Sequence, residues 1–541
     1  MFRIALRMQR LGIIGMAFFG VVGGAVQALA FNSAAGTTEA ARQAFAQQMT
    51  VLGQQISYLL PIPVGVDTIG GYLQWRVYGG YPFVVLIWAV LSASGATRGD
   101  EEKGLVEVWL AKGVSRLWYL LVRFAAFAVA AVAFAAGMGA AVYLGAAASG
   151  NPLDLMALAE ISLAMVCLIL VLYAIGLVLA QPVSTRSAAA GLIGGVLTIL
   201  FLVNSLGRTV DSLRPIARVV SPFYYYDLNT PLRSGGTFDI AATVGLFAAA
   251  VILAAVAAIL MQRRDLGSAL IRRRPRTHPP VYRPDPNPLL RLPVVESLYE
   301  HRVGLLAWTL GTAIGAAYFA SLGKQLVDLV TSTQGSLRAY LALVGHHDLY
   351  VSLTGFFWFG FFQLILAIYA ITQVARWAAE DNEGRLEMEL SAPVPRWRVV
   401  LERALTLLVS LTILIGVSSV ALYIAAHSIN IDVPSGDLFI ASVVLIPFGT
   451  TFGAVGAALA SRVPRATVAV LVTIAGLSYL LVQIGPILKW PDWVLKLSVF
   501  TLYGNPLTGG VKWDGLLEML AICVLGFGLA TILMQRREVG R

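Results

Sequence analysis

The chain has 541 residues, of which 58% are hydrophobic and 13% charged, and its formal net charge is +10. A soluble domain has about 25% charged residues, so this composition excludes an ordinary water-soluble globular protein. The sequence shows no basic surface with aromatic side chains interleaved, which argues against a nucleic-acid partner. The excess of basic residues therefore favours contact with anionic lipid headgroups.

Apolar runs recur along the whole chain, each long enough to cross a hydrocarbon layer, which takes about 20 helical residues. We predict an all-α polytopic protein of the plasma membrane with about twelve transmembrane helices. The predicted spans are 11–30, 78–96, 121–148, 155–180, 188–206, 239–261, 303–322, 353–375, 401–427, 437–460, 467–488 and 515–534.

The first span is the one run that also fits a secretory signal, because three arginines precede it and Ala28-Leu29-Ala30 ends it. We interpret it as a span, since it is long for a signal and "QRLGIIGM" (9–16) has a counterpart in "HRVGLLAW" (301–308). With the N-terminus inside, the inner loops carry most of the Lys and Arg residues. The positive-inside rule therefore predicts that both termini are cytoplasmic.

The chain contains an internal repeat. A shift of 280 residues aligns "DEEKGLVEVWLAKGVSRLWYLLVR" (100–123) with "EDNEGRLEMELSAPVPRWRVVLER" (380–403) without gaps, and "MQRRD" at 261 matches "MQRRE" at 534. An even number of spans gives both copies the same orientation, so we predict two parallel six-helix repeats. The halves are 1–262 and 294–541, and the Pro/Arg-rich segment 263–293 is predicted to be an extended cytoplasmic linker.

The aligned block lies in the cytoplasmic loop between the second and third spans of each half. Glu383 and Glu387 are four residues apart, as are Leu386 and Leu390, which predicts a short helix with an acidic and an apolar stripe. Such a helix can be a solvated connector on the bilayer or a docking helix for a soluble partner. Its acidic face favours docking, because anionic lipids would repel it.

The pattern E-x-x-x-G-x-x-E-x-x-L-x-x-P-V-x-R at 380–396 resembles the cytoplasmic loop signature of type-2 ABC exporter permeases. The six-span unit and "SPFYYYDLNTPL" (221–232) are also similar to that family, and the duplicated form most resembles actinobacterial tetronasin and multidrug antibiotic exporter permeases. The first copy departs from the pattern, with Lys103 in place of glutamate and Gly113 in place of proline. Its coupling is therefore expected to differ from that of the second copy.

The resemblance implies that the two short helices are coupling helices, received by two copies of a soluble ATP-binding subunit. The chain has no G-x-x-x-x-G-K-[ST] phosphate loop, so we expect no cofactor in this chain, with ATP and Mg²⁺ held by the partners. The implied function is export of small amphiphilic or drug-like molecules by alternating access. The candidate ATPase contacts are Glu101, Gly104, Glu107, Arg116, Glu380, Glu383, Gly384, Glu387 and Arg396.

The resemblance implies that the second and fifth spans of each half lie near the interface between the halves, so polar and aromatic side chains there are candidates for the substrate pathway. Such aromatic rings more often serve packing, and the polar side chains could instead bond a neighbouring helix. The candidates are Trp88, Asn204, Phe359, Gln363 and Gln483. His346 and His347 lack a third spaced ligand, so we predict no metal site.

Two other function classes compete with the exporter. An ion-gradient-driven secondary transporter would place charged residues near the bilayer midplane. A polytopic membrane transferase would place a carboxylate or histidine cluster at one membrane face. The sequence shows neither pattern, and it has no nucleophile elbow, so we predict that the chain is not an enzyme.

Overall fold

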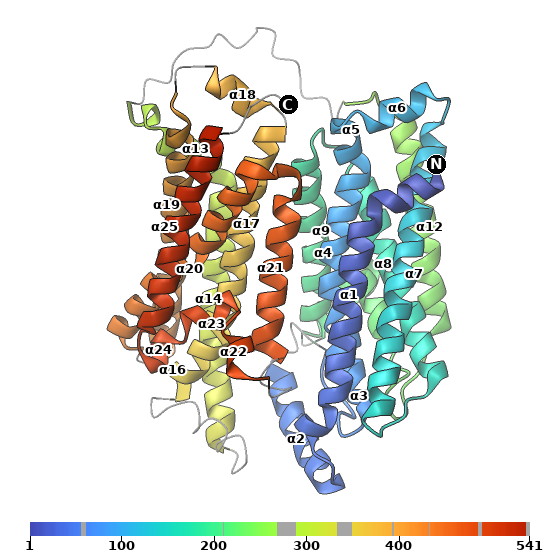
Figure 1. Ribbon diagram of the computed structural model, residues 1–541. Coiled ribbons are helices and arrows are strands. Elements are labelled where there is room, and N and C mark those ends of the chain that lie inside the picture. The colour runs from blue at the N-terminus through green and yellow to red at the C-terminus, as the bar shows by residue number, and fades with distance from the viewer. Residues whose placement is uncertain are drawn as a thin grey trace. The chain divides into compact units, whose positions relative to one another are not determined.

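The computed structural model describes residues 1–55, 61–208, 210–267, 288–332, 349–382, 384–391, 394–431, 433–484 and 490–536. Every regular element in these ranges is a helix, which confirms the predicted all-α class (Figure 1). The chain divides into two compact units, Met1–Pro280 and Val281–Arg541, called unit 1 and unit 2 below. Each unit has its own buried hydrophobic core. Glu383, Pro393, His346 and His347 lie outside the described residues, as does most of the predicted linker.

Unit 1 combines long apolar helices with short helices at their ends. Its α-helices are α1 (Phe2–Ala35), α2 (Glu39–Gln55), α3 (Ile69–Leu73), α4 (Tyr81–Ser94), α5 (Asp100–Glu102), α6 (Leu105–Ala111), α7 (Arg116–Ala148), α8 (Leu155–Leu179), α9 (Arg186–Gly207), α10 (Arg214–Val220), α11 (Pro222–Asp227) and α12 (Ile240–Arg263). Two π-helical segments, η1 (Gln74–Tyr78) and η2 (Gly95–Gly99), flank α4.

Unit 2 has a similar set of elements. They are η3 (Pro288–Arg291), α13 (Pro293–Glu300), α14 (Arg302–Ser332), α16 (Leu349–Thr354), η4 (Gly355–Phe359), α17 (Gly360–Asn382), α18 (Arg385–Leu390), α19 (Arg396–Ser428), α20 (Ser435–Arg462), α21 (Pro464–Ile484), α22 (Asp492–Leu495), α23 (Val499–Tyr503), α24 (Pro506–Gly509) and α25 (Trp513–Arg536). The 280-residue shift of the repeat aligns the π-helical segment η4 with η1, to within one residue.

Among the described residues, 12 helices are long and apolar enough to cross a membrane, as predicted. The chain is therefore a multi-pass membrane protein. The observed helices extend beyond the predicted runs. For example, α1 begins at Phe2 rather than at residue 11, because Arg3, Arg7 and Arg10 are good helix formers although they interrupt the apolar pattern.

The same packing pattern occurs in both units. In unit 1, α1 packs on α7, α4 packs on α8 and α9, and α8 packs on α12. In unit 2, α14 packs on α19, α17 packs on α20 and α21, and α20 packs on α25. The aligned glycines Gly176 and Gly456 permit close approach of α8 to α4 and of α20 to α17. A Cβ atom on Gly176 would lie 2.6 Å from Cβ of Ala93, and one on Gly456 would lie 2.5 Å from Cγ2 of Val374.

The short helices divide between the two ends of each unit. In unit 1, α5, α6 and the N-terminus lie at one end, and α2 and α3 lie at the other (Figure 1). In unit 2, α13 and α18 lie at one end, opposite α16, α22 and α24 (Figure 1). We call these the α6 end of unit 1 and the α18 end of unit 2.

Candidate functional site

The helices α6 and α18 begin with the same backbone turn. Gly104 and Gly384 hold left-handed conformations, with φ of 67° and 74°, and each donates its N–H to the carbonyl three residues earlier. A Cβ atom would meet nothing within 4 Å at either position, so the requirement for glycine is conformational rather than steric. A second left-handed glycine, Gly113, follows the end of helix α6, where this conformation commonly terminates a helix.

Each short helix has one buried anchor followed by an exposed face. Val106 and Leu386 are buried and attach the helices to their units. The next residues, Glu107 and Glu387, are exposed. The hydrophobic side chains after them are also exposed, 52% at Val108 and 68% at Met388. The two helices therefore present matching acidic and apolar surface to the exterior.

Arg116 and Arg396 connect the segment after each short helix to the last long helix of its unit. Nη1 of Arg116 donates to the carbonyls of Met261, Gln262 and Arg264 at the end of α12. Nη1 of Arg396 donates to the carbonyls of Met534 (2.9 Å) and Gln535 (3.2 Å) at the end of α25. A guanidinium at a helix C-terminus satisfies free carbonyls and complements the negative end of the helix dipole.

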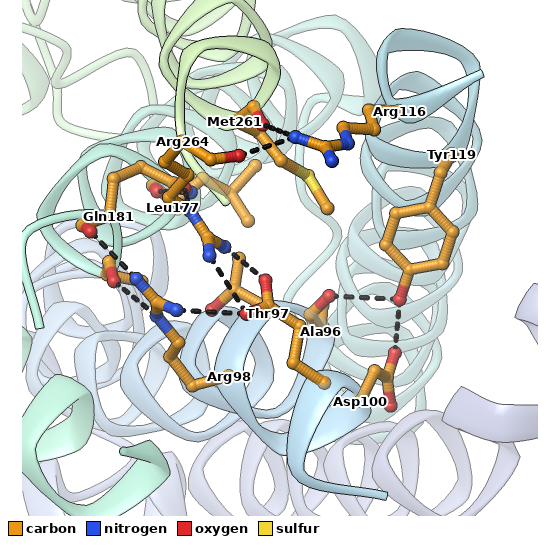
Figure 2. Close-up of polar contacts among 12 residues, drawn as sticks. Ala96, Thr97, Arg98, Asp100, Arg116, Tyr119, Leu177, Gln181, Met261 and Arg264 are labelled. Carbon is orange, nitrogen blue, oxygen red and sulfur yellow. Dashed lines mark hydrogen bonds and ion pairs between the residues drawn. The ribbon is translucent and has the colours of Figure 1, made fainter. Parts of the chain in front are cut away.

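Glu101 lies inside unit 1, in a buried polar network shown in part in Figure 2. Its carboxylate pairs with Arg98 (2.9 Å) and with both terminal nitrogens of Arg264, and its side chain is 5% exposed. Arg98 also donates to the carbonyls of Ala180 (3.0 Å) and Gln181 (2.7 Å) at the end of α8, and Arg264 donates to Oε1 of Gln181 (2.7 Å). The network therefore joins α5 to the ends of α8 and α12.

A second ion pair lies beside this network and has a counterpart in unit 2. Asp100 pairs with Arg123 at 3.0 Å. It also accepts a 2.6 Å hydrogen bond from the hydroxyl of Tyr119, as Figure 2 shows. At the positions aligned with Asp100 and Arg123, Glu380 pairs with Arg403 at 2.8 Å. The pair in unit 1 is 6–8% exposed, whereas in unit 2 Glu380 is 34% exposed.

Aligned cavities lie beside these two ion pairs. The cavity in unit 1 has a volume of about 460 Å³, and its charged lining is Asp100, Lys103, Arg123 and Arg186. Trp88 and Gln9 also line it, and neither amide atom of Gln9 has a hydrogen-bond partner among the residues that the structure describes.

The cavity in unit 2, of about 190 Å³, has the opposite balance of charge. Its charged lining is Glu296, Glu300, Glu380, Glu389, Glu402, Arg376 and Arg403, with His301 at the place of Gln9. Burial raises the pKa of Glu389, with Arg403 opposing the shift and Glu380 adding to it. The repeat therefore places cationic lining in one unit and mainly acidic lining in the other.

The predicted pathway residues have different surroundings within their own units. Trp88 lines the unit 1 cavity while its ring packs 4.8 Å from that of Phe127. Phe359 is 1% exposed and stacks on Tyr503, so it belongs to the core of unit 2. Gln363 is 6% exposed, and its Oε1 atom has no hydrogen-bond partner within the described ranges.

The other two pathway candidates lie near helix ends. Asn204 is buried near the end of α9 and donates to Asp227 at 2.8 Å. Gln483 lies in the last turn of α21, and its side chain is outside the described structure.

Sequence reasoning missed Arg98, Gln181 and Arg264. Arg98 and Gln181 are polar residues at the ends of apolar runs, which is where loops begin, so nothing marked them as buried. One signal was available: the repeat preserves both the arginine at 116 and 396 and the MQRR segment at 261 and 534. These two conserved parts of the repeat are in contact in the structure.

Residues 290–534 match the family model described as "Multidrug efflux system permease Rv1217c, C-terminal domain". Unit 2 is similar to an efflux permease domain. The match covers most of unit 2, including α18 and the acidic cavity. Together with the apolar helices, it indicates a membrane permease rather than an enzyme. No curated protein matches the chain.

Proposed function

We propose that the chain is the permease subunit of an ATP-driven ABC exporter of small amphiphilic or drug-like molecules. The α6 and α18 ends are cytoplasmic in this proposal. Each of the two helices docks one copy of a soluble ATP-binding subunit, which holds ATP and Mg²⁺. The similarity of unit 2 to a multidrug efflux permease domain supports the direction and class of transport.

The observation that carries the proposal is the paired exposure of acidic and apolar side chains on helices with identical anchoring. A connector lying on anionic lipid would favour lysine and arginine on its polar face. Here the exposed residues are Glu107 with Val108 in one copy and Glu387 with Met388 in the other. An apolar centre with charge beside it is typical of a protein interface, where charge provides specificity.

The contacts behind each helix suggest how a force applied there would reach the long helices. In unit 1 the path leads through Arg116 to α12, and through Glu101 with its two arginines to α8 and α12. In unit 2 it leads through Arg396 to α25. Glu101 and Arg116 thus act as positioning residues within the unit, and Glu107 and Glu387 are the residues that touch the partner. Closure of the ATPases would reorient both bundles between inward and outward states.

The cavity that contains Trp88 and Gln9 is the proposed cytoplasmic entry for substrate. Its lining includes Asp100 and Lys103, next to α6. The amide of Gln9, unpaired in the described part of the chain, and the buried face of Trp88 offer one polar and one apolar contact. Such a combination suits an amphiphile.

The test is co-purification of the chain with a candidate ATP-binding subunit, followed by measurement of its ATPase activity. Glu107→Lys and Glu387→Lys should each weaken the complex or abolish stimulation of ATP hydrolysis, because each reverses charge at the exposed contact. Glu39→Lys is the matched control, since Glu39 is an exposed acid on α2 at the opposite end of unit 1. Full coupling in both variants, with unchanged complex formation, would refute the proposal.

A further inference from the structure

A third cavity, of about 320 Å³, lies in unit 1 at the end opposite α6. Its walls come from η1, the end of α9, and α11 with the loop that follows it. Known small-molecule pockets begin at about 300 Å³, so the cavity can accept a headgroup or a compact ligand. It is separate from the cavity that contains Trp88.

Internal hydrogen bonds hold the walls of this cavity in place. Oδ2 of Asp227 accepts from Nδ2 of Asn204 (2.8 Å) and from Nε and Nη2 of Arg208 (2.9 and 2.7 Å). The hydroxyl of Tyr226 donates to the carbonyl of Tyr78 (2.9 Å), which ties α11 to η1. A site held this way is preformed, so a ligand would not have to order it.

The lining keeps hydrogen-bond donors without partners. Nε1 of Trp75, Nη1 of Arg208 and Nε of Arg233 are each buried and unbonded within the described structure, and Trp75 is only 6% exposed. Every unpaired buried side-chain atom on this lining is a donor. A buried donor left unpaired is destabilising, so three in one cavity indicate a missing acceptor.

The charge of the lining leads to the same conclusion. Arg208, Arg214 and Arg233 line the cavity, and among the described residues of the lining Asp227 is the one carboxylate. Asp227 is already paired with Arg208, and the partner of Arg214, Asp211, lies off the lining. Burial lowers the pKa of Arg233, because it removes water from around the guanidinium. A negatively charged ligand would replace that water.

We propose that this cavity binds the anionic headgroup, carboxylate or phosphate, of an amphiphile. Trp75, Arg208 and Arg233 donate hydrogen bonds to its oxygens. The apolar part of the ligand lies against Ile62 and Val64, which are 40% and 44% exposed on the lining. The inference is independent of the proposed ATPase coupling. A membrane lipid and a free acidic amphiphile share this chemistry, so the test includes both.

Binding is measured by native mass spectrometry of the full chain in a neutral detergent. The probes are dioctanoyl phosphatidylglycerol, decanoate and, as the net-neutral control, dioctanoyl phosphatidylcholine. We expect at least one anionic probe to bind and phosphatidylcholine to bind much more weakly. Binding of phosphatidylglycerol alone assigns the site to a lipid headgroup, and binding of decanoate assigns it to free acidic amphiphiles.

Two variants connect the binding to the cavity. Arg233→Gln removes a charge that makes no hydrogen bond or ion pair in the described structure, and Trp75→Phe removes one N–H while keeping an aromatic ring. Each should weaken anion binding about tenfold, which is the effect of losing one hydrogen bond to a charged group. Arg218→Gln is the matched control, because Arg218 is exposed on α10 and off this lining.

Melting temperatures of the variants in detergent show whether each is folded. The proposal is overturned if neither anionic probe binds, if phosphatidylcholine binds equally well, or if folded Arg233→Gln and Trp75→Phe both bind the anion as tightly as the unmodified chain. Because no ATPase is present, failure here would leave the coupling proposal standing.

Discussion

The α6 end of unit 1 and the α18 end of unit 2 share a backbone plan but differ in how charge is buried. Both have the left-handed glycine, the buried anchor, the exposed glutamate and the arginine at the end of the last helix. In unit 1, Arg98, Glu101 and Arg264 form a closed network. In unit 2, Ala378 stands at the place of Arg98, and five glutamates line the neighbouring cavity.

This difference teaches that exterior and interior follow different constraints. If the α6 and α18 ends each receive a partner, as we propose, they must keep the same shape and charge in both copies. The interior has only to balance its own charge, either with ion pairs that are shielded from water or by keeping the charged groups in contact with solvent. We therefore expect unit 1 to be held rigidly beneath α6 and unit 2 to be more tolerant of substitution beneath α18.

The largest difference is expected at the centre of the unit 1 network. Glu101→Gln leaves Arg98 and Arg264 facing each other, with side chains 0% and 2% exposed. Removing one member of a buried charged network costs about 3–5 kcal/mol, so the yield of monodisperse protein and its melting temperature should fall sharply. Asp381→Asn, at the aligned position, should have a smaller effect because Ala378 replaces the arginine there. Equal losses would contradict the comparison.

A smaller difference in stability is expected between variants of the two aligned ion pairs, Asp100–Arg123 and Glu380–Arg403. Asp100→Asn breaks a pair whose side chains are 6–8% exposed and also weakens the bond from Tyr119. We expect a cost of about 3 kcal/mol in unit 1, as for a buried pair. Glu380→Gln breaks a pair in which the carboxylate is 34% exposed, and about 1 kcal/mol is expected for it. Melting in detergent compares them, and a larger effect in unit 2 would reverse our interpretation.

Substitution of Arg116 and of Arg396 should have similar effects in the two units. Each alanine variant removes a cation from a helix C-terminus, worth about 1 kcal/mol. Hydrogen exchange should increase in the last turn of α12 for Arg116→Ala and of α25 for Arg396→Ala, by comparable factors. Lysine variants should restore protection in part, since they keep the charge but lose the planar fork. An effect confined to one unit would show that the two contacts are not equivalent.

The smallest effect should come from acidification of unit 2. The pKa of Glu389 is raised above its ordinary value of 4.5, so the folded chain takes up this proton at a higher pH than the unfolded chain does. Stability should therefore increase slightly as the pH falls through the window just above 4.5. The gain is small because Glu389 loses only part of its contact with water, and solvent screens the shift. Glu389→Gln should lose part of this pH dependence in thermal melts, whereas Glu39→Gln, in unit 1, should keep all of it.

Much of the fold could be predicted because its causes are local. Apolar runs of sufficient length give the twelve helices, since a span is defined by its own hydrophobicity and length. Gly104 and Gly384 mark where the short helices begin, because few other residues adopt a left-handed backbone without strain. The repeat could be recognised because several residues separated by the same shift of 280 positions are identical.

The sequence by itself therefore determined the helices, their number and the exposed acidic positions Glu107 and Glu387. Only the tertiary structure decided that Glu101 and Arg116, which belong to the same motif, face inward, and that Trp75, Arg208 and Arg233 line one cavity. One of the two arginines paired with Glu101, Arg264, lies 163 residues away. Local patterns specify which residues form a helix, but pairing between distant charges depends on which helices pack together and on how their ends align.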